Sequence, residues 1–170
     1  MKILITGQTG LASALSDVYK DHNVYCVSRS TGHDINLIKT WGDLFLDCDV
    51  VFNCAYSDFA QLKVLEFFFE HWKDLTNKKI ITIGSRAINQ PPSDPSLGYW
   101  PYRVHKQALQ LAHDTMISKA KCDMKIINPG PIDTPMIAHL DVIKFNPATL
   151  AEKIKTLSED QNIKRVDLWV

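Results

Sequence analysis

The chain has 170 residues, 45% of them hydrophobic and 22% charged, a composition typical of one ordinary soluble domain spanning residues 1–170. Nineteen basic residues balance nineteen acidic ones, so no overall field favours nucleic acid or a membrane surface. The longest apolar run, 64–69, is interrupted by Glu66 and is too short to span a bilayer. We therefore expect no nucleic-acid partner and no membrane partner.

The cysteines and histidines indicate a cytoplasmic protein without a metal site. The four cysteines include no Cys-x-x-Cys pair, and Cys26 and Cys54 lie in apolar, strand-like runs, as reduced structural thiols do. The six histidines include no His-x-x-x-His spacing, so no metal ligands are assigned. The N-terminal residues lack the apolar segment of a signal peptide.

The first candidate site is a glycine turn between a strand and a helix. An apolar run over 2–6 leads into the turn, and a helical pattern with Leu11 and Leu15 on its inner face continues to about Lys20. A helix that begins in this way offers free N–H groups and a positive dipole end to a pyrophosphate. An ordinary strand-to-helix turn is the alternative. The expected dinucleotide contacts are Gly7, Gln8, Thr9, Gly10 and Leu11.

The tip of the next strand bears on the choice of cofactor. A strand-like run over 23–30 ends in Ser28, Arg29 and Ser30. An NAD-binding unit would carry an acidic residue about 20 residues after the glycines, for the ribose 2′-hydroxyl. An arginine with hydroxyl neighbours suits a 2′-phosphate instead, so NADP(H) is preferred and NAD(H) remains possible. A solvated arginine is the alternative reading.

The middle of the chain predicts further helices and strands in alternation. A short helix is expected over 37–46, followed by a continuous apolar strand over 49–55. The next helix, 59–73, is apolar on nearly every side, which indicates contact with a partner subunit or, equally, a deep core position. The apolar positions of the short helix are Leu37, Ile38, Trp41 and Leu44.

The segment that follows carries the candidate catalytic residues. A strand over 79–85 ends at Ser85, and a long proline-containing loop separates it from a helix that begins at Pro101 and continues to about Lys119. The expected inner stripe of that helix is Val104, Ala108, Leu109, Leu111, Ala112 and Met116.

Tyr102 and Lys106 are four residues apart in this helix, so they lie on one face, one turn apart. A positive charge beside a phenol favours the phenolate, so the pKa of Tyr102 is expected to fall below its usual value of about 10, toward the range of a general acid. Alone, such a pair occurs by chance in nearly every other chain of this composition, and ordinary packing is the alternative.

The last third of the chain completes the pattern. A strand over 124–128 ends in a Pro/Gly-rich turn over 129–136, and a helix over 147–158 and a strand over 165–170 follow. Strands alternating with helices predict an α/β fold of the Rossmann type, a doubly wound parallel sheet with helices on both faces.

The order of these motifs resembles that of the short-chain dehydrogenase/reductase family. Residues 6–10 are similar to the family's Thr-Gly cofactor turn, and residues 129–136 to its Pro-Gly…Thr turn beside the nicotinamide. Ser85, Tyr102 and Lys106 match the catalytic Ser and Tyr-x-x-x-Lys. Further cofactor contacts implied by the resemblance are Asp34, Ile35, Asn53, Cys54, Ala55, Tyr102, Lys106, Pro129, Gly130, Ile132 and Thr134.

The resemblance implies an NADP(H)-dependent enzyme that reduces a small carbonyl substrate or oxidises the alcohol. Tyr102 would protonate the forming alkoxide and Ser85 would hydrogen-bond the same oxygen, while Lys106 would lower the phenol pKa and hold the nicotinamide ribose. Arg86 would bind an anionic group on the substrate. The expected substrate contacts, with ordinary loop packing as an equal alternative, are Arg86, Tyr99, Trp100, Met136 and Ile137.

The chain departs from the family pattern in three places. Ala12 or Ser13 stands at the third glycine position, where Ser13 would add bulk between helix and strand. No asparagine lies between Asn53 and Asn77, so the catalytic Asn of many relatives is absent or replaced. The segment 137–146 is shorter than the substrate lid that relatives often carry.

Two other functions remain open. The missing Asn and the short lid favour a non-enzymatic NADP-binding sensor or scaffold, and the Gly-x-x-Gly-x-x-Ser spacing favours a nucleotide-sugar epimerase or dehydratase. In each case a homodimer or homotetramer is expected, formed through the helices over 59–73 and 102–119.

Overall fold

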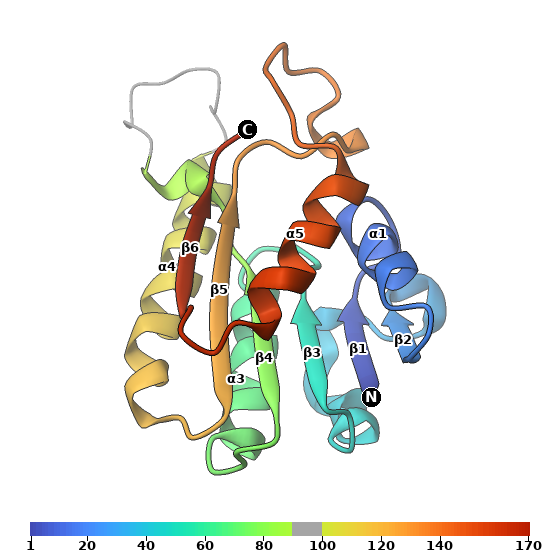
Figure 1. Ribbon diagram of the computed structural model, residues 1–170, viewed down its shortest axis with the longest axis vertical. Helices are drawn as coiled ribbons and strands as arrows, with labels where there is room; N and C mark the ends of the chain where they lie inside the picture. The colour runs from blue at the N-terminus through green and yellow to red at the C-terminus, as the bar shows by residue number, and fades with distance from the viewer. Residues whose placement is uncertain (90–99) are drawn as a thin grey trace.

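The computed structural model describes residues 1–89 and 100–170, and within them six parallel strands form one sheet in the order β2-β1-β3-β4-β5-β6 (Figure 1). The inner strands are mainly apolar, as burial on both faces requires, whereas the two edge strands are partly exposed and contain polar residues. The strands are β1 (Lys2–Thr6), β2 (Asn23–Val27), β3 (Val50–Asn53), β4 (Lys79–Ile83), β5 (Asp123–Pro129) and β6 (Arg165–Leu168).

The strand order reverses direction between β1 and β3. β1 pairs with β2 on one side, with Leu4 opposite Tyr25, and with β3 on the other, with Leu4 opposite Val51. From β3 the order continues outward through β4, β5 and β6. In doubly wound sheets ligands bind at this switch point, outside the carboxyl ends of the strands.

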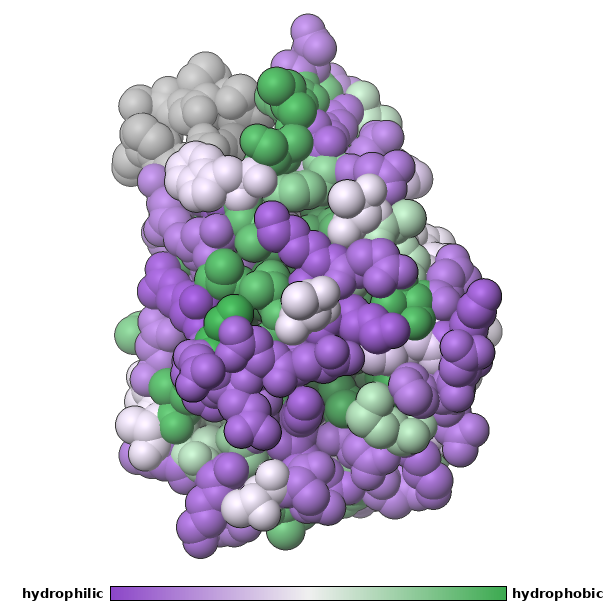
Figure 2. Space-filling view, viewed as in Figure 1, coloured by the Kyte–Doolittle hydropathy of each residue, from purple (hydrophilic) through white to green (hydrophobic). Residues whose placement is uncertain are grey.

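Helices cover both faces of the sheet. α1 (Leu11–Val18) and α5 (Pro147–Glu159) lie side by side on one face, and α3 (Ala60–Trp72) and α4 (Trp100–Met116) lie on the other (Figure 1). Each pair encloses its own apolar core, one centred on Leu15 and Ile154 and the other on Phe68 and Leu109. The outer surface over α1 and α5 is mostly hydrophilic, with apolar side chains in small separate groups (Figure 2).

The predicted fold class is confirmed, with all six strands within a few residues of their expected bounds. The helix expected over 37–46 is instead split into a 3-10 turn at Ile35–Leu37, the short α2 (Ile38–Trp41) and a second 3-10 turn at Gly42–Phe45. Leu37 and Leu44 are exposed, while Ile38 and Trp41 are buried. The four side chains cannot all lie on one buried face, because the 3-10 turns and the α-helix rotate successive residues about the axis by different angles.

The predicted inner stripe of α4 is wrong for two of its members. Val104 is 43% exposed and Leu111 is 70% exposed. The positions that α4 buries are Lys106, Leu109, Gln110 and His113, three of which are polar. Apolar periodicity could not find a face whose buried residues form hydrogen bonds rather than apolar contacts.

α3 is also less uniformly apolar than its sequence suggested. Lys63, Glu66 and Glu70 occupy its exposed positions, while Val64, Leu65 and Phe68 are fully buried. The helix therefore has a solvated side, in keeping with the reading as a core helix packed on the sheet. Among the helices described, none is both long enough and apolar enough to cross a membrane.

Candidate active site

The predicted site residues gather at the carboxyl edge of the sheet, toward the top of Figure 1. Because all strands are parallel, the segments that leave β1, β3, β4 and β5 emerge at this one edge. The glycine turn, the 53–55 segment, Ser85 and the Pro-Gly turn thus become neighbours although more than 120 residues separate the first from the last.

The glycine turn has the conformation that the sequence predicted. Gly7 has φ of 105° and Gly10 has φ of 57°, both in the region that favours glycine. Gly10 is the N-cap of α1, and no side chain caps the helix, so its first-turn amides face the sheet edge without competition from a capping group. These features fit a pyrophosphate group.

The expected clash at Ser13 does not occur. Ser13 is exposed, and Ala12 is the residue that packs against the turn: a Cβ on Gly7 would lie 3.1 Å from the Ala12 Cβ. The small side chain therefore stands where helix and strand approach each other. The Gly-x-x-Gly-x-x-Ser spacing leaves the packing of α1 intact.

Thr6 and Thr134 join the glycine turn to the neighbouring loops. The buried Thr6 hydroxyl accepts hydrogen bonds from the backbone N–H groups of Cys54 (2.9 Å) and Ala55 (3.0 Å). Thr134 contacts the turn so closely that a Cβ on Gly10 would lie 2.8 Å from its Cγ2. Three of the predicted cofactor segments therefore form one continuous surface.

The candidate 2′-phosphate site is a cluster of hydroxyl and amide groups beside Arg29. The hydroxyls of Ser28 and Ser30 donate to the Gln8 Oε1 at 2.9 and 2.7 Å, and their oxygens are 2.7 Å apart. Arg29 is exposed in the first position of a 3-10 turn at Arg29–Thr31. Gln8 was predicted for the pyrophosphate, yet its side chain organises this second cluster.

Asp34 and Ile35 occupy the edge of the same region. The Asp34 carboxylate accepts hydrogen bonds from the backbone N–H and the side-chain Nδ2 of Asn36, both at 2.9 Å. These bonds, and more weakly the charge of Arg29, hold the pKa of Asp34 below its usual value. Ile35 is buried. The carboxylate is therefore ionised and fixed in place at neutral pH.

Ser85 and Tyr102 are brought together as predicted, because the Ser85 side chain hydrogen-bonds the phenol of Tyr102. The expected lowering of the phenol pKa is wrong. Burial raises the pKa of Tyr102, and the hydrogen bond from Ser85 only partly opposes it. Lys106 places its Nζ near the ring, 5.5 Å from the centroid, and donates its hydrogen bonds to Gln61 and to the Ile83 carbonyl.

Lys106 is the most strongly perturbed cation of the site. It is 4% exposed, and its Nζ donates to the Gln61 Oε1 at 2.7 Å and to the Ile83 carbonyl at 2.9 Å. Burial lowers the pKa of Lys106 to about 7, because the two acceptors are neutral and do not offset the lost solvation. The ring of Tyr56 lies on the same side as that of Tyr102, with its centroid 5.8 Å from Nζ.

Gln61 is a site residue that the sequence reasoning missed. It is 2% exposed, and besides accepting from Lys106 it donates to the carbonyls of Asn53 (2.7 Å) and Ile83 (2.8 Å). Asn53 in turn donates its Nδ2 to the Gln61 carbonyl at 2.8 Å. One amide therefore connects β3, β4 and α4. The sequence did contain a signal for Gln61, because it is a single amide on the sheet-facing side of an otherwise apolar helix.

Tyr56 and His105 were missed as well. The Tyr56 hydroxyl is 2.9 Å from the His105 Nδ1, and the Tyr56 ring meets the Tyr102 ring edge to face with centroids 4.8 Å apart. Phe59 covers the His105 ring at a centroid distance of 4.2 Å. These aromatic residues form a wall beside the candidate catalytic phenol.

The predicted substrate residues differ in how far they are exposed. Arg86 is 9% exposed, whereas Trp100 and Met136 are 71% and 60% exposed. Ile137 is intermediate, and Tyr99 lies outside the described residues. In the Pro-Gly turn, Pro129 and Gly130 are buried and Ile132 is half-buried.

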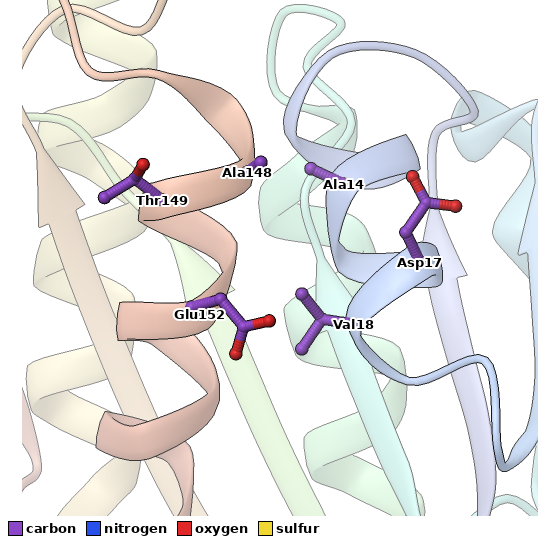
Figure 3. A pocket seen from close by; sticks show the side chains of 6 residues that line it. All are labelled: Ala14, Asp17, Val18, Ala148, Thr149 and Glu152. Carbon is purple, nitrogen blue, oxygen red and sulfur yellow. The ribbon is translucent and has the colours of Figure 1, made fainter.

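A shallow hollow of about 370 Å³ lies elsewhere, between α1 and α5, where Ala14 and Ala148 face each other (Figure 3). Its remaining lining includes the carboxylates of Asp17 and Glu152 (Figure 3). It is on a face of the sheet, away from the carboxyl edge, and contains none of the predicted site residues. Within residues 1–89 and 100–170, no three His, Cys, Asp or Glu side chains are placed to hold a metal.

The lowered pKa of Lys106 predicts a pH dependence of stability. Between pH 7 and its unfolded pKa of 10.5 the unfolded chain binds the proton that the folded chain releases, so the free energy of unfolding rises with pH. Urea unfolding should show a gain of about 2 kcal/mol between pH 7 and pH 9. Lys106→Met should abolish most of this gain, and the exposed-site control Lys63→Met should retain it. A wild-type curve that is flat or falls over this range would contradict the burial of an unpaired ammonium.

No protein-family model and no curated protein sequence matches the chain, but solved structures do. A short-chain dehydrogenase from Burkholderia cenocepacia J2315, solved with NADP, has a TM-score of 0.82 and 16% identity over 100% of this chain and 90% of that chain. The 3-alpha-hydroxysteroid dehydrogenase of Pseudomonas sp. B-0831, solved with NADH, has a TM-score of 0.72 and 17% identity over 98% and 95%. Serine dehydrogenase from Escherichia coli has a TM-score of 0.72 and 12% identity over 100% and 97%. The chain therefore has the fold of the short-chain dehydrogenases/reductases, as its motifs suggested.

Proposed function

We propose that the protein is an NADP(H)-dependent oxidoreductase of the short-chain dehydrogenase/reductase type that reduces a small carbonyl substrate, or oxidises the corresponding alcohol. The observation that carries the proposal is the hydrogen bond between Ser85 and Tyr102, with Lys106 one helical turn away. This group lies at the same sheet edge as the glycine turn of β1. The fold shared with nicotinamide-dependent enzymes supports it.

Tyr102 acts as the proton donor and Ser85 as the second donor to one oxygen. Burial keeps the Tyr102 phenol protonated at neutral pH, which is the form that must donate to a developing alkoxide. Two donors already held together stabilise the charge that appears on a carbonyl oxygen. A nicotinamide cofactor bound along the sheet edge would supply the hydride.

Lys106 supplies a positive charge, and its burial lowers the pKa at which that charge is lost. With a pKa of about 7 the side chain gains or loses its proton easily near neutral pH, so a hydroxyl or phenol placed beside it exchanges protons readily. Gln61 accepts a hydrogen bond from the Nζ at 2.7 Å and so fixes the position of the amine.

The preference for NADP(H) rests on Arg29 and its hydroxyl neighbours. The exposed Arg29 guanidinium can donate to a 2′-phosphate, and the Ser28, Ser30 and Gln8 side chains form a hydrogen-bonded polar cluster beside it. The similar structures were solved with NADP in one case and NADH in another, which supports the nicotinamide class of cofactor. At the adenine side, Asp34 and Ile35 provide an ionised acceptor and an apolar contact.

The two alternative functions are weaker. A non-enzymatic NADP-binding sensor would not need Ser85 and Tyr102 to be paired, nor a lysine kept at a buried position. An epimerase was suggested by the spacing around Ser13, but Ala12 preserves the packing there, so the spacing has no structural effect that favours one reaction over another.

We also propose a cytoplasmic homo-oligomer. Val104 and Leu111 lie seven residues apart on one side of α4 and are 43% and 70% exposed, so α4 offers an apolar face for a second copy. The exposed side of α3 is charged and supports this role less. All four cysteines are free, which suits a reducing compartment.

Removing the Tyr102 hydroxyl should abolish turnover while leaving cofactor binding intact. Tyr102→Phe is expected to lower kcat for NADPH oxidation by about 1,000-fold, because the proton donor is lost and the ring remains. The measurement is NADPH absorbance with ketones, aldehydes and quinones. Tyr25→Phe, which removes the same hydroxyl from a tyrosine of β2 that is 41% exposed, is the control. Tight NADPH binding with no turnover on any substrate in the wild type would support the sensor instead.

Gln61 should set the pH dependence of the reaction through Lys106. Gln61→Leu is expected to lower kcat/KM by about 10- to 100-fold, because the ammonium loses its best acceptor. Gln61→Glu is expected to raise the lysine pKa and move the pH–rate profile upward. Gln110→Leu, at another buried amide, which lies on α4 and accepts a hydrogen bond from Asn128, should leave the apparent pKa unchanged. Equal profiles for all three variants would make Gln61 a purely structural residue.

Arg29 should discriminate between the two cofactors. Arg29→Ala is expected to weaken NADPH binding by about 10- to 100-fold and to change NADH binding by less than about threefold, because only NADPH carries the 2′-phosphate. Cofactor fluorescence on titration gives both dissociation constants. Arg165→Ala, another exposed arginine at the start of β6, is the control. Similar losses for both cofactors would remove the basis for the preference.

A further inference from the structure

Arg86 is a buried cation next to the candidate catalytic serine. It follows Ser85 directly and begins the 3-10 turn Arg86–Asn89. Its Nη1 would be 3.8 Å from a Cβ on Gly130, so the guanidinium lies beside the Pro-Gly turn. The cation thus stands between two segments of the candidate active site, the ends of β4 and β5.

The guanidinium has little compensation from the protein. Its Nε is buried without a hydrogen-bond partner, and within the described ranges it forms no ion pair. Asp167 acts on its charge from a distance, but the two oxygens of that carboxylate accept from Asn128 (2.8 Å) and Asn89 (3.0 Å). A buried charge that lacks a partner is costly, so such a residue is seldom kept for packing alone.

Trp169 covers part of the Arg86 guanidinium. The Arg86 Cζ lies over the indole ring, while Trp169 itself is 69% exposed beyond the end of β6. Arg86 therefore lies near the surface under a thin aromatic cover. Stacking occupies a face of the guanidinium and leaves the in-plane N–H groups to bind an acceptor.

We propose that Arg86 binds a carboxylate of the substrate, so that the substrates are small oxo acids and the corresponding hydroxy acids. The fork of guanidinium N–H groups matches a carboxylate in a bidentate arrangement. Arg86 follows Ser85 directly and its guanidinium lies beside Gly130, so an acid bound there would lie next to the chain segment that carries Ser85. This inference rests on the proposed reduction, which it extends by naming the substrate class.

A binding measurement tests Arg86 without turnover. With NADP⁺ present no hydride is available, so 2-oxobutanoate, 3-oxobutanoate and 4-oxopentanoate can be titrated while tryptophan fluorescence is followed. We expect a saturable change with the acids and none with their methyl esters. Trp169→Phe should remove the signal, which locates its source, and Arg86→Met should remove the binding. Arg165→Met should alter neither.

A kinetic measurement tests the consequence for specificity. In NADPH oxidation the acids should exceed their methyl esters in kcat/KM by about 100-fold, because an ester cannot pair with a buried guanidinium. Arg86→Met should reduce this preference to near unity by lowering the rate with the acids only. Arg86→Lys, which keeps the charge but loses the bidentate pair of N–H groups, should give an intermediate preference. This variant provides the test if Arg86→Met does not fold.

The outcomes separate the two proposals. Carboxylate-dependent quenching that Arg86→Met abolishes, without turnover of any carbonyl compound, would support the Arg86 site and refute the reduction. Turnover of esters and acids at equal rates, or an equal loss for both in Arg86→Met, would refute the Arg86 site and leave the reduction standing. Quenching by acids that persists in both Arg86 variants would also refute the Arg86 site.

Discussion

Lys106 places an ammonium group in the interior between α3, α4 and the end of β4, where its Nζ donates hydrogen bonds to two neutral oxygens. A charge in this position is stable only while those acceptors stay in place. Both depend on Gln61, which accepts from the lysine directly and donates to the Ile83 carbonyl beside it. The geometry of the candidate site therefore depends on a contact between one amide and one amine.

The same contact ties the site to the sheet. Gln61 also donates to the Asn53 carbonyl at the end of β3, and Asn53 returns a hydrogen bond to the Gln61 backbone. Thr6 binds the next two amides of that segment and so extends the network to β1. The glycine turn, the lysine and the Ser85 strand thus share one set of buried hydrogen bonds, and disturbance of one is expected to reach the others.

The sequence predicted the strands well because most of them are short apolar runs bounded by turn residues, a local signal that tertiary contacts reinforce. The parallel order then brought Ser85, Tyr102 and the glycine turn to one edge without further information. The burial of polar residues could not be predicted from the sequence. Gln61 and Gln110 are buried because each satisfies a specific partner across the fold, and Val104 is exposed although it is apolar. Such partners are many residues apart, so no window of sequence contains the signal.

The prediction for the Tyr102 pKa was wrong for the same reason, because it took no account of burial, and the correction changes the expected chemistry of the site. The Tyr-x-x-x-Lys spacing places charge near a phenol, but the sign of the pKa shift depends on solvation, which the spacing does not contain. In the folded chain, burial raises the phenol pKa and lowers that of Lys106 to about 7, so both neutral forms are favoured. Arg86, directly after Ser85, is a second cation with little compensation. Among the described residues, neither Arg86 nor the protonated form of Lys106 has an anionic partner of its own, so a bound anion would stabilise both charges. A phosphorylated dinucleotide and an acidic substrate are the kinds of ligand that would supply those charges.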